Sequence, residues 1–335
     1  MKKSFFHQIL LKILIILILM LGIPYTITML LNGTRASSST TIPYDGRIVV
    51  LEDLPLTPSL DYSQYLSGMV ARLLISFDET VFESPEFIRL NCLIANTLLT
   101  EEFKESNMIR ENFLSTYYIS ENDLKTLWKE EYPQRMDMIN SMIRTTKNQV
   151  LTHNGNLIKP FYHFISNGMT RACDTSDTYP YLKSVKTNQD LEEPGFLCVN
   201  QLNNEDFIRE LQSSYPDFHL PDAAPAAGLA NVSGQDYTSL KENIQITQRD
   251  PYGYVAQIQI GNLLLSGDEF MNLFDLKSTS FTFSFQEKSL KIITKGVGHG
   301  YGISLSYALS MAKSGSTAED ILEFFYENVE IKSLE

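Results

Sequence analysis

The stretch Gly296-Val297-Gly298-His299-Gly300-Tyr301-Gly302-Ile303-Ser304 is the most distinctive local sequence of this chain. It follows a predicted strand and opens a predicted helix. A glycine-rich backbone nest that leads into a helix N-terminus suits the binding of anionic or polar oxygen atoms. A nucleotide site is poorly supported, because no Gly-Lys-Ser/Thr ending follows and no later strand carries an acidic residue about 20 positions on. The alternative is a tight turn that needs several small residues.

The elements predicted around this stretch mix helices and strands without a regular rhythm. Asn154-Gly155 separates two strand-like runs, 149–153 and 157–161, and is the strongest short hairpin signal in the chain. This pattern predicts an α+β architecture in place of a doubly wound sheet. The other predicted helices cover two stripes within 59–103, then 120 onward, 132–144, 203–214, 266 onward, 303–313 and 317–326. The other predicted strands cover 244–247, 254–260, 281–285 and 290–293.

The N-terminal residues predict a membrane helix. Residues 13–31 carry no charge and consist mostly of Ile and Leu, and lysines precede them. At about 1.5 Å per residue this run approaches the roughly 30 Å of a hydrocarbon core. The charge bias predicts a single-pass protein of the cell membrane with residues 1–12 in the cytoplasm, a spacer at 32–58 and an extracytoplasmic domain at 59–335. A cleaved signal peptide is the alternative and gives the same topology for the domain.

Composition limits the partners. The chain has 43% hydrophobic and 11% aromatic residues, as expected of a globular protein, and a net charge of -13. This acidity argues against nucleic acid as a partner.

The sequence has three cysteines. Cys92 lies in an apolar helical pattern and is predicted to be buried, whereas Cys173 and Cys198 could be bridged, bind a metal or remain free thiols.

Four colinear segments resemble the stage II sporulation protein D family, which includes the amidase enhancers. The glycine-rich stretch, followed by Met311-Ala312 and Asp320-Ile321-Leu322, is similar to the family's closing signature. The likeness spans about residues 56 to 331, with a core at 59–185 and 254–331 and a less certain insert at 186–253. The other matching segments are 65–71, the run from Val150 through His163, Ser166 and Thr170 to Val185, and the run from Leu265 to Thr279.

The resemblance implies a protein that acts on peptidoglycan during sporulation. Enzymes of this family are lytic transglycosylases that cut denuded glycan strands and need no cofactor. One carboxylic acid protonates the glycosidic oxygen, and the C6 hydroxyl of the sugar then closes an anhydro ring. A single carboxyl with a raised pKa can carry both proton transfers.

This sequence departs from the family where the acid should stand. The family motif Gly-Val-Val-Ala-x-Glu-Met corresponds to residues 68–74, and Leu73 occupies the glutamate position. Leucine cannot transfer a proton, so the sequence predicts weak or lost cleavage. Glu79 and Glu83 are the nearby candidates for a displaced acid, although a solvated loop is the simpler interpretation. The family lysine is replaced by Arg89, and the family arginine by Asn96.

The resemblance leaves three hypotheses and one candidate site. The chain could bind or organise wall glycan without cutting it, cut glycan through a displaced carboxylate, or act as a module of a sporulation membrane complex. The matching histidines could either bind sugar or hold the fold together. A partial metal site formed by His163, Cys173 and Cys198 is a weak further possibility. The candidate glycan groove consists of His299, Ser304, Gly298, Gly300, His163, Ser166, Arg89 and Asn96.

Overall fold

The computed structural model describes residues 42–44, 47–49, 62–106, 113, 116–173, 178–220 and 238–334. The chain divides into two compact units, one of Met1–Tyr65 with Glu102–Thr116 and one of Leu66–Glu101 with Tyr117–Glu335. In the first unit, β1 (Ile42–Tyr44) and β2 (Arg47–Val49) form an antiparallel pair. The second unit holds the glycine-rich stretch.

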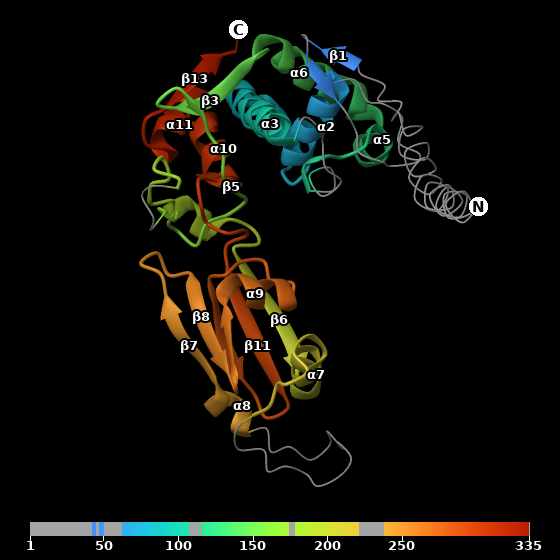
Figure 1. The fold of residues 1–335 in the computed structure, drawn as a ribbon. Coiled ribbons are helices and arrows are strands. Elements are labelled where there is room, and N and C mark those ends of the chain that lie inside the picture. The colour runs from blue at the N-terminus through green and yellow to red at the C-terminus, as the bar shows by residue number, and fades with distance from the viewer. Residues whose placement is uncertain are drawn as a thin grey trace, which may run out of the picture. The chain divides into compact units, whose positions relative to one another are not determined.

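The second unit mixes helices and sheets, so the architecture is α+β (Figure 1). Its sheets have the strand orders β10-β11-β6, β7-β8-β9, β13-β3-β4 and β12-β5. The helices are α2 (Tyr62–Leu74) and α3 (Pro85–Ser106), which both extend into the first unit, α5 (Glu121–Trp128), α6 (Tyr132–Thr145), α7 (Asn204–Ser214), α8 (Thr238–Asn243), α9 (Gly267–Leu273), α10 (Leu305–Lys313) and α11 (Ala318–Phe325), with short 3-10 helices η1 (Glu79–Glu83), η2 (Lys129–Glu131) and η3 (Asn188–Glu192). The strands are β3 (Gln149–His153), β4 (Asn156–Leu157), β5 (Tyr162–His163), β6 (Leu197–Asn203), β7 (Ile244–Arg249), β8 (Val255–Ile260), β9 (Leu263–Ser266), β10 (Phe281–Phe285), β11 (Ser289–Lys295), β12 (Ile303–Ser304) and β13 (Val329–Ser333).

Side-chain caps explain where several helices begin. Ser120 accepts a hydrogen bond from the backbone N–H of Asp123 and caps α5. Ser266 and Thr317 form capping boxes with Glu269 and Asp320 at the starts of α9 and α11. Each cap satisfies N–H groups that the first helical turn leaves without partners, which fixes the end of the helix locally.

The hairpin predicted at Asn154-Gly155 is confirmed. Asn154 has a φ of 50° and Gly155 a φ of 76°, as a two-residue hairpin turn requires. β3 pairs with β4 on one side and with β13 on the other. The second strand is shorter than the sequence predicts, because it ends at Leu157.

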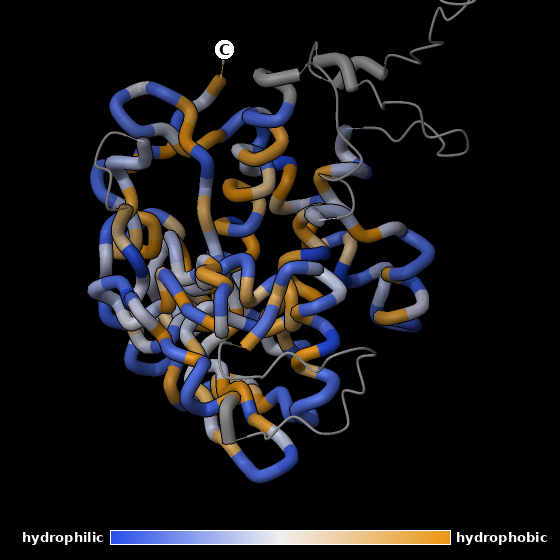
Figure 2. Tube along the Cα trace, turned by 60° about the horizontal axis from the view of Figure 1, so that its bottom comes forward, coloured by the Kyte–Doolittle hydropathy of each residue, from blue (hydrophilic) through white to orange (hydrophobic). Residues whose placement is uncertain are grey.

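A hydrophobic core lies against the sheet β10-β11-β6. Leu290 and Ile292 of β11 point into this core, where Phe207 of α7 stacks on Phe274 with ring centroids 4.8 Å apart. Phe270 of α9 lies 5.0 Å from Phe281 of β10. Hydrophobic segments gather in the interior and hydrophilic loops predominate outside (Figure 2). The segment 186–253 contributes β6 to this sheet, because β6 pairs with β11 along its whole length.

The prediction of a single-pass membrane protein is corrected here. Among the residues that the structure describes, no helix combines the length and the apolar character that a membrane span needs. α3 has 22 residues, but charged side chains at both of its ends, among them Glu86, Arg89 and Glu101, exclude it. The predicted span at 13–31 lies outside the described residues. The cytoplasmic N-terminus and the extracytoplasmic domain depended on that span and are not retained.

The main chain of the glycine-rich stretch passes very close to neighbouring segments of the protein. Four glycines alternate with larger residues, and all four have positive φ angles between 69° and 111°: Gly296, Gly298, Gly300 and Gly302. A Cβ atom at Gly302 would lie 2.0 Å from the carbonyl oxygen of Phe161, and one at Gly298 would lie 2.6 Å from the Cβ of His163. Other residues would therefore be excluded both by backbone conformation and by space.

We predict that Gly302→Ala destabilises the fold far more than Gly155→Ala. Both positions have positive φ, so both variants carry a backbone penalty of about 1–2 kcal/mol. Only at Gly302 does the new methyl group meet the main chain, whereas nothing lies within 4 Å at Gly155. Overpacking should add about 1–3 kcal/mol, which urea denaturation would measure. Equal losses for the two variants would contradict a steric role for Gly302.

Candidate functional site around the glycine-rich segment

Most of the described N–H groups of the glycine-rich stretch have partners within the protein. Val297 donates to Ile165 O at 2.7 Å, and Gly298 donates to Lys277 O at 2.7 Å. Tyr301 donates to His299 Nδ1 at 3.1 Å, and Ile303 donates to Phe161 O at 3.0 Å. An anion-binding nest needs free N–H groups. The four N–H groups named here are therefore not available to an anion, and they hold the segment where it crosses between its neighbours.

Two histidines lie beside this crossing in defined tautomers. His163 Nδ1 lies 3.0 Å from the carbonyl oxygen of Tyr301, so it must carry the proton and donate. His299 Nδ1 accepts from the N–H of Tyr301, so its proton lies on Nε2. The two rings are 6.1 Å apart. Among the described residues, the buried Nε2 atom of His163 has no hydrogen-bond partner.

Both histidines are held neutral. Burial lowers the pKa of His163 to about 3, and the neighbouring His299 acts in the same direction. Burial likewise lowers the pKa of His299 to about 4, with further contributions from the charges of Arg171 and Lys159. A histidine with such a pKa is a poor proton acceptor at neutral pH. The pair is therefore suited to hydrogen bonding and packing, and not to proton transfer.

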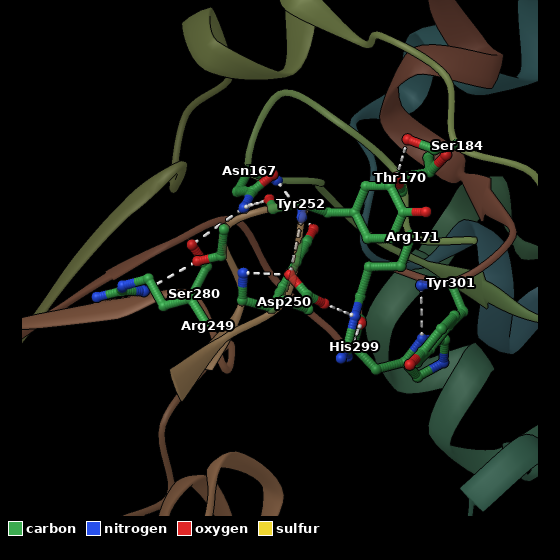
Figure 3. A network of polar contacts seen from close by, with 12 residues as sticks. Asn167, Thr170, Arg171, Ser184, Arg249, Asp250, Tyr252, Ser280, His299 and Tyr301 are labelled. Carbon is green, nitrogen blue, oxygen red and sulfur yellow. Dashed lines mark hydrogen bonds and ion pairs between the residues drawn. The ribbon is translucent and has the colours of Figure 1, made fainter. Parts of the chain in front are cut away.

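Arg171 connects the stretch to the loop before β8 (Figure 3). Its Nε donates to Asp250 Oδ2 at 2.6 Å and its Nη1 donates to the carbonyl oxygen of His299 at 3.1 Å. The guanidinium carbon lies 4.3 Å from the ring centroid of Tyr301 and 4.9 Å from that of Tyr254. The Asp250 side chain is 6% exposed. This buried ion pair fixes the backbone at His299 and the ring of Tyr301.

Asp190 forms a second buried centre. Its Oδ2 accepts from the N–H of Ser166 at 2.9 Å and from the hydroxyl of Ser304 at 2.7 Å. The hydroxyls of Ser166 and Thr187 hydrogen-bond to each other. Burial raises the pKa of Asp190, and these hydrogen bonds oppose the shift. The carboxyl thus joins η3, the loop after β5 and the start of α10.

A group of partly exposed rings flanks the stretch on the side of Phe161. Phe161 lies 4.8 Å from Tyr179, 6.0 Å from His299 and 6.3 Å from Tyr301, measured between ring centroids. The ammonium group of Lys159 lies 5.4 Å from the centroid of Phe161. We call these four rings and this lysine the aromatic cluster. It combines apolar ring surface with one mobile positive charge.

Comparison with known proteins shows what this chain is similar to. Stage II sporulation protein D of Bacillus amyloliquefaciens is 26% identical over 291 residues, which cover 84% of this chain and 75% of that protein. The protein of the same name from Bacillus subtilis (strain 168) is 25% identical over the same length, with the same coverage of each chain. The chain resembles the stage II sporulation protein D family over most of its length. The resemblance seen in the sequence is confirmed.

Two further comparisons add detail. The amidase enhancer of Bacillus subtilis (strain 168) is 23% identical over 228 residues, which cover 58% of this chain and 32% of that protein. No protein-family model matches the chain.

The position of the family's acid lies in α2. Leu73 is 8% exposed there, and the end of this helix approaches β5 through Phe77, whose ring is 4.7 Å from that of Phe164. Glu79 and Glu83 lie exposed on η1, where Glu79 Oε2 is 4.0 Å from Arg135 Nη2. Both glutamates thus lie on the solvent-exposed surface of η1.

The other predicted groove residues are mainly engaged within the protein. Arg89 forms two hydrogen bonds of 2.5 Å with Glu319 and so joins α3 to α11. Asn96 donates to the carbonyl oxygen of Thr146 at 3.0 Å. Ser166 and Ser304 are fully buried on Asp190. Of the predicted side chains, His299 belongs to the aromatic cluster, and His163 packs directly behind it.

The three cysteines are free thiols in this structure. Within the described ranges, no group of three or more His, Cys, Asp or Glu side chains is arranged to hold a metal ion. His163, Cys173 and Cys198 are therefore not brought together as a site. Burial raises the pKa of the Cys92 thiol, which keeps it protonated.

Sequence reasoning missed Arg171, Asp250, Asp190 and Tyr254. Arg171 and Asp250 are 79 positions apart, and Asp190 and Ser304 are 114 positions apart. None of these residues forms a local motif with its partner. Only the folded chain reveals these pairs.

We predict that Arg171→Leu costs about 3–5 kcal/mol of folding free energy, because it leaves the Asp250 carboxylate buried without its partner. Asp250→Asn removes the charge and retains Oδ1, which accepts from the N–H groups of Tyr252 and Tyr254. The double variant Arg171→Leu/Asp250→Asn should therefore recover part of the loss. Urea denaturation of all four proteins gives the coupling energy. Simple additivity of the two losses would refute the pairing.

We predict that stability falls as the pH is lowered from about 6.5 towards 4. Both histidines have folded pKa values below the unfolded value of 6.5, so the unfolded state binds protons first. The contribution of the two neutral histidines to folding stability is complete above pH 6.5. It is lost as the pH falls from 6.5 towards 4. Each histidine contributes up to about 1.4 kcal/mol per pH unit.

In the variant His163→Asn, the folding free energy should fall less per pH unit than in the unmodified protein, whatever the stability of the variant at neutral pH. Asn retains a donor near the position of Nδ1 but cannot bind a proton in this range. The exposed His219→Asn variant provides the reference for losing one histidine elsewhere. An unchanged slope in His163→Asn would show that His163 does not resist protonation in the folded state.

Proposed function

We propose that this protein binds glycan strands of the cell wall during sporulation, with weak or no cleavage. The aromatic cluster is the observation that carries this proposal. Pyranose rings have apolar C–H faces that pack on aromatic side chains, and the cluster offers Phe161, Tyr179 and Tyr301 together. The names of the relatives, which refer to sporulation and to amidase enhancement, give the biological setting.

Charge supports the same substrate. Denuded wall strands carry carboxylates on alternate sugars, and Lys159 places an ammonium group next to the ring of Phe161. Arg171 lies under Tyr301 but is already paired with Asp250, so Lys159 is the group able to meet a substrate carboxylate. A neutral His299 can add a donor from Nε2. Ring stacking, one cation and one neutral donor make a binding surface for an anionic polysaccharide.

The positions of the carboxylate side chains near the aromatic cluster favour glycan binding over glycan cleavage. Leu73 stands where the family has its acid. Asp250 is engaged in a buried ion pair with Arg171, and Asp190 is fully buried among hydroxyl and N–H donors. A general acid must carry a proton and also reach the glycosidic oxygen. None of these groups meets both conditions. Glu79 and Glu83, the displaced acids of the alternative hypothesis, lie exposed on η1 and make no recorded contact with the aromatic cluster.

The test combines binding with product analysis. We expect the purified protein to sediment with denuded glycan strands and to release few or no anhydro-sugar products. Phe161→Ala should weaken sedimentation by about tenfold or more, because it removes the central ring. Leu127→Ala, a variant of an exposed leucine on α5, serves as the matched control.

Cleavage is checked in the same samples. Leu73→Glu restores the acid and should raise the yield of anhydro products, whereas Leu73→Gln, of similar size, should not. Abundant products from the unmodified protein that disappear in Glu79→Gln or Glu83→Gln would replace this proposal with active cleavage. No sedimentation with glycan would leave only a role as an interaction module.

A further inference from the structure

The strand β6 forms one edge of its sheet. It is the outer strand in the order β10-β11-β6, and no other strand among the described residues pairs with it. Its sequence Leu-Cys-Val-Asn-Gln-Leu-Asn contains no charge, no proline and no glycine, and its register with β11 runs unbroken over seven residues. Edge strands usually carry lysine, proline or a bulge that prevents pairing. The edge strand β7, for comparison, has register shifts and ends on Arg249.

On the outward face of this sheet, the edge strand β6 carries apolar side chains and the next strand, β11, carries positive charges. Leu197 and Val199 of β6 are 58% and 57% exposed. On the same face, β11 places Lys295 opposite Leu197, Ile293 opposite Val199 and Lys291 opposite Gln201. β10 adds Thr282 and Ser284. No acidic residue lies on this face of the three strands, although the whole chain has a net charge of -13.

We propose that the free edge of β6 binds an extended acidic segment of a partner protein by strand addition. An added strand would lie about 4.8 Å from β6, and hence about 10 Å from β11. Side chains of Lys291 and Lys295 can reach across one strand to carboxylates at that distance. On the same face of the added strand, an apolar side chain beside Val199 would cover the apolar edge, and the acidic side chains two residues before and after it would meet the lysines. Main-chain hydrogen bonds would give affinity, and the lysines would select acidic partners.

Charge favours an acidic segment of a partner protein over a second copy of the chain at the edge of β6. If two β6 strands paired edge to edge, the contact strands would bring no acidic side chain to face Lys291 or Lys295. The two copies would also each carry a net charge of -13, which disfavours their approach at low salt. Self-association is therefore the competing outcome of the test. The proposal uses residues other than the aromatic cluster and does not depend on glycan binding.

The probe is a dye-labelled peptide, Thr-Glu-Thr-Val-Thr-Glu-Thr, in which both glutamates and the valine lie on one face of an extended strand. It is titrated with the full chain and followed by fluorescence anisotropy. We expect saturable binding that weakens as ionic strength rises from about 0.05 to about 0.5 M, since added salt screens the charges. The matching peptide with lysine in place of both glutamates should not bind. Val199→Lys and the double variant Lys291→Glu/Lys295→Glu should each weaken binding by about tenfold or more.

The control variant is Leu264→Lys, which changes an equally exposed leucine on the edge strand β9. It should bind the acidic peptide like the unmodified chain. Urea denaturation of each variant shows that the fold is intact. The proposal is overturned if the acidic peptide does not bind, if both peptides bind equally, or if the β6 variants bind normally. Sedimentation that shows a β6-dependent dimer, without peptide binding, would assign this edge to a second copy.

Discussion

The close passage of the glycine-rich stretch between its neighbours is the constraint on which the site depends. Gly298 touches the Cβ of His163, Gly300 meets the ring of Tyr254, and Gly302 lies against the carbonyl of Phe161. Because these residues have no Cβ and adopt positive φ, the main chain can hydrogen-bond with segments on both sides. β5, the loop before β8 and the start of α10 are held in one arrangement by this crossing.

The arrangement determines which chemistry the site can offer. The crossing buries His163 and largely buries His299, and burial keeps both neutral by lowering their pKa values. The main chain at His299 in turn accepts from Arg171, whose charge is neutralised by Asp250. Few groups remain that could transfer a proton. Rings and hydrogen-bond donors remain in fixed positions, and these favour binding of a substrate over its chemical conversion.

Local signals in the sequence predicted much of the fold. Ser120, Ser266 and the Asn154-Gly155 turn were recognisable because each forms hydrogen bonds or backbone angles within a few residues. The membrane prediction relied on a run of apolar residues at 13–31, which lies outside the described residues, and among the described helices none is long and apolar enough to cross a membrane. The sequence could not show that several N–H groups of the glycine-rich stretch find partners within the protein, because most of those partners lie on distant segments.

The sequence by itself determined the resemblance to the stage II sporulation protein D family and the positions of most helices and strands. These features depend on the order of residues along the chain. Only the tertiary structure decided that Arg89 and Asn96 join distant segments, that Arg171 pairs with Asp250, and that β6 is an edge strand among the described residues. A buried polar group must find a partner wherever packing places one, and that partner can lie 79 or 114 residues away. No local pattern records such a choice.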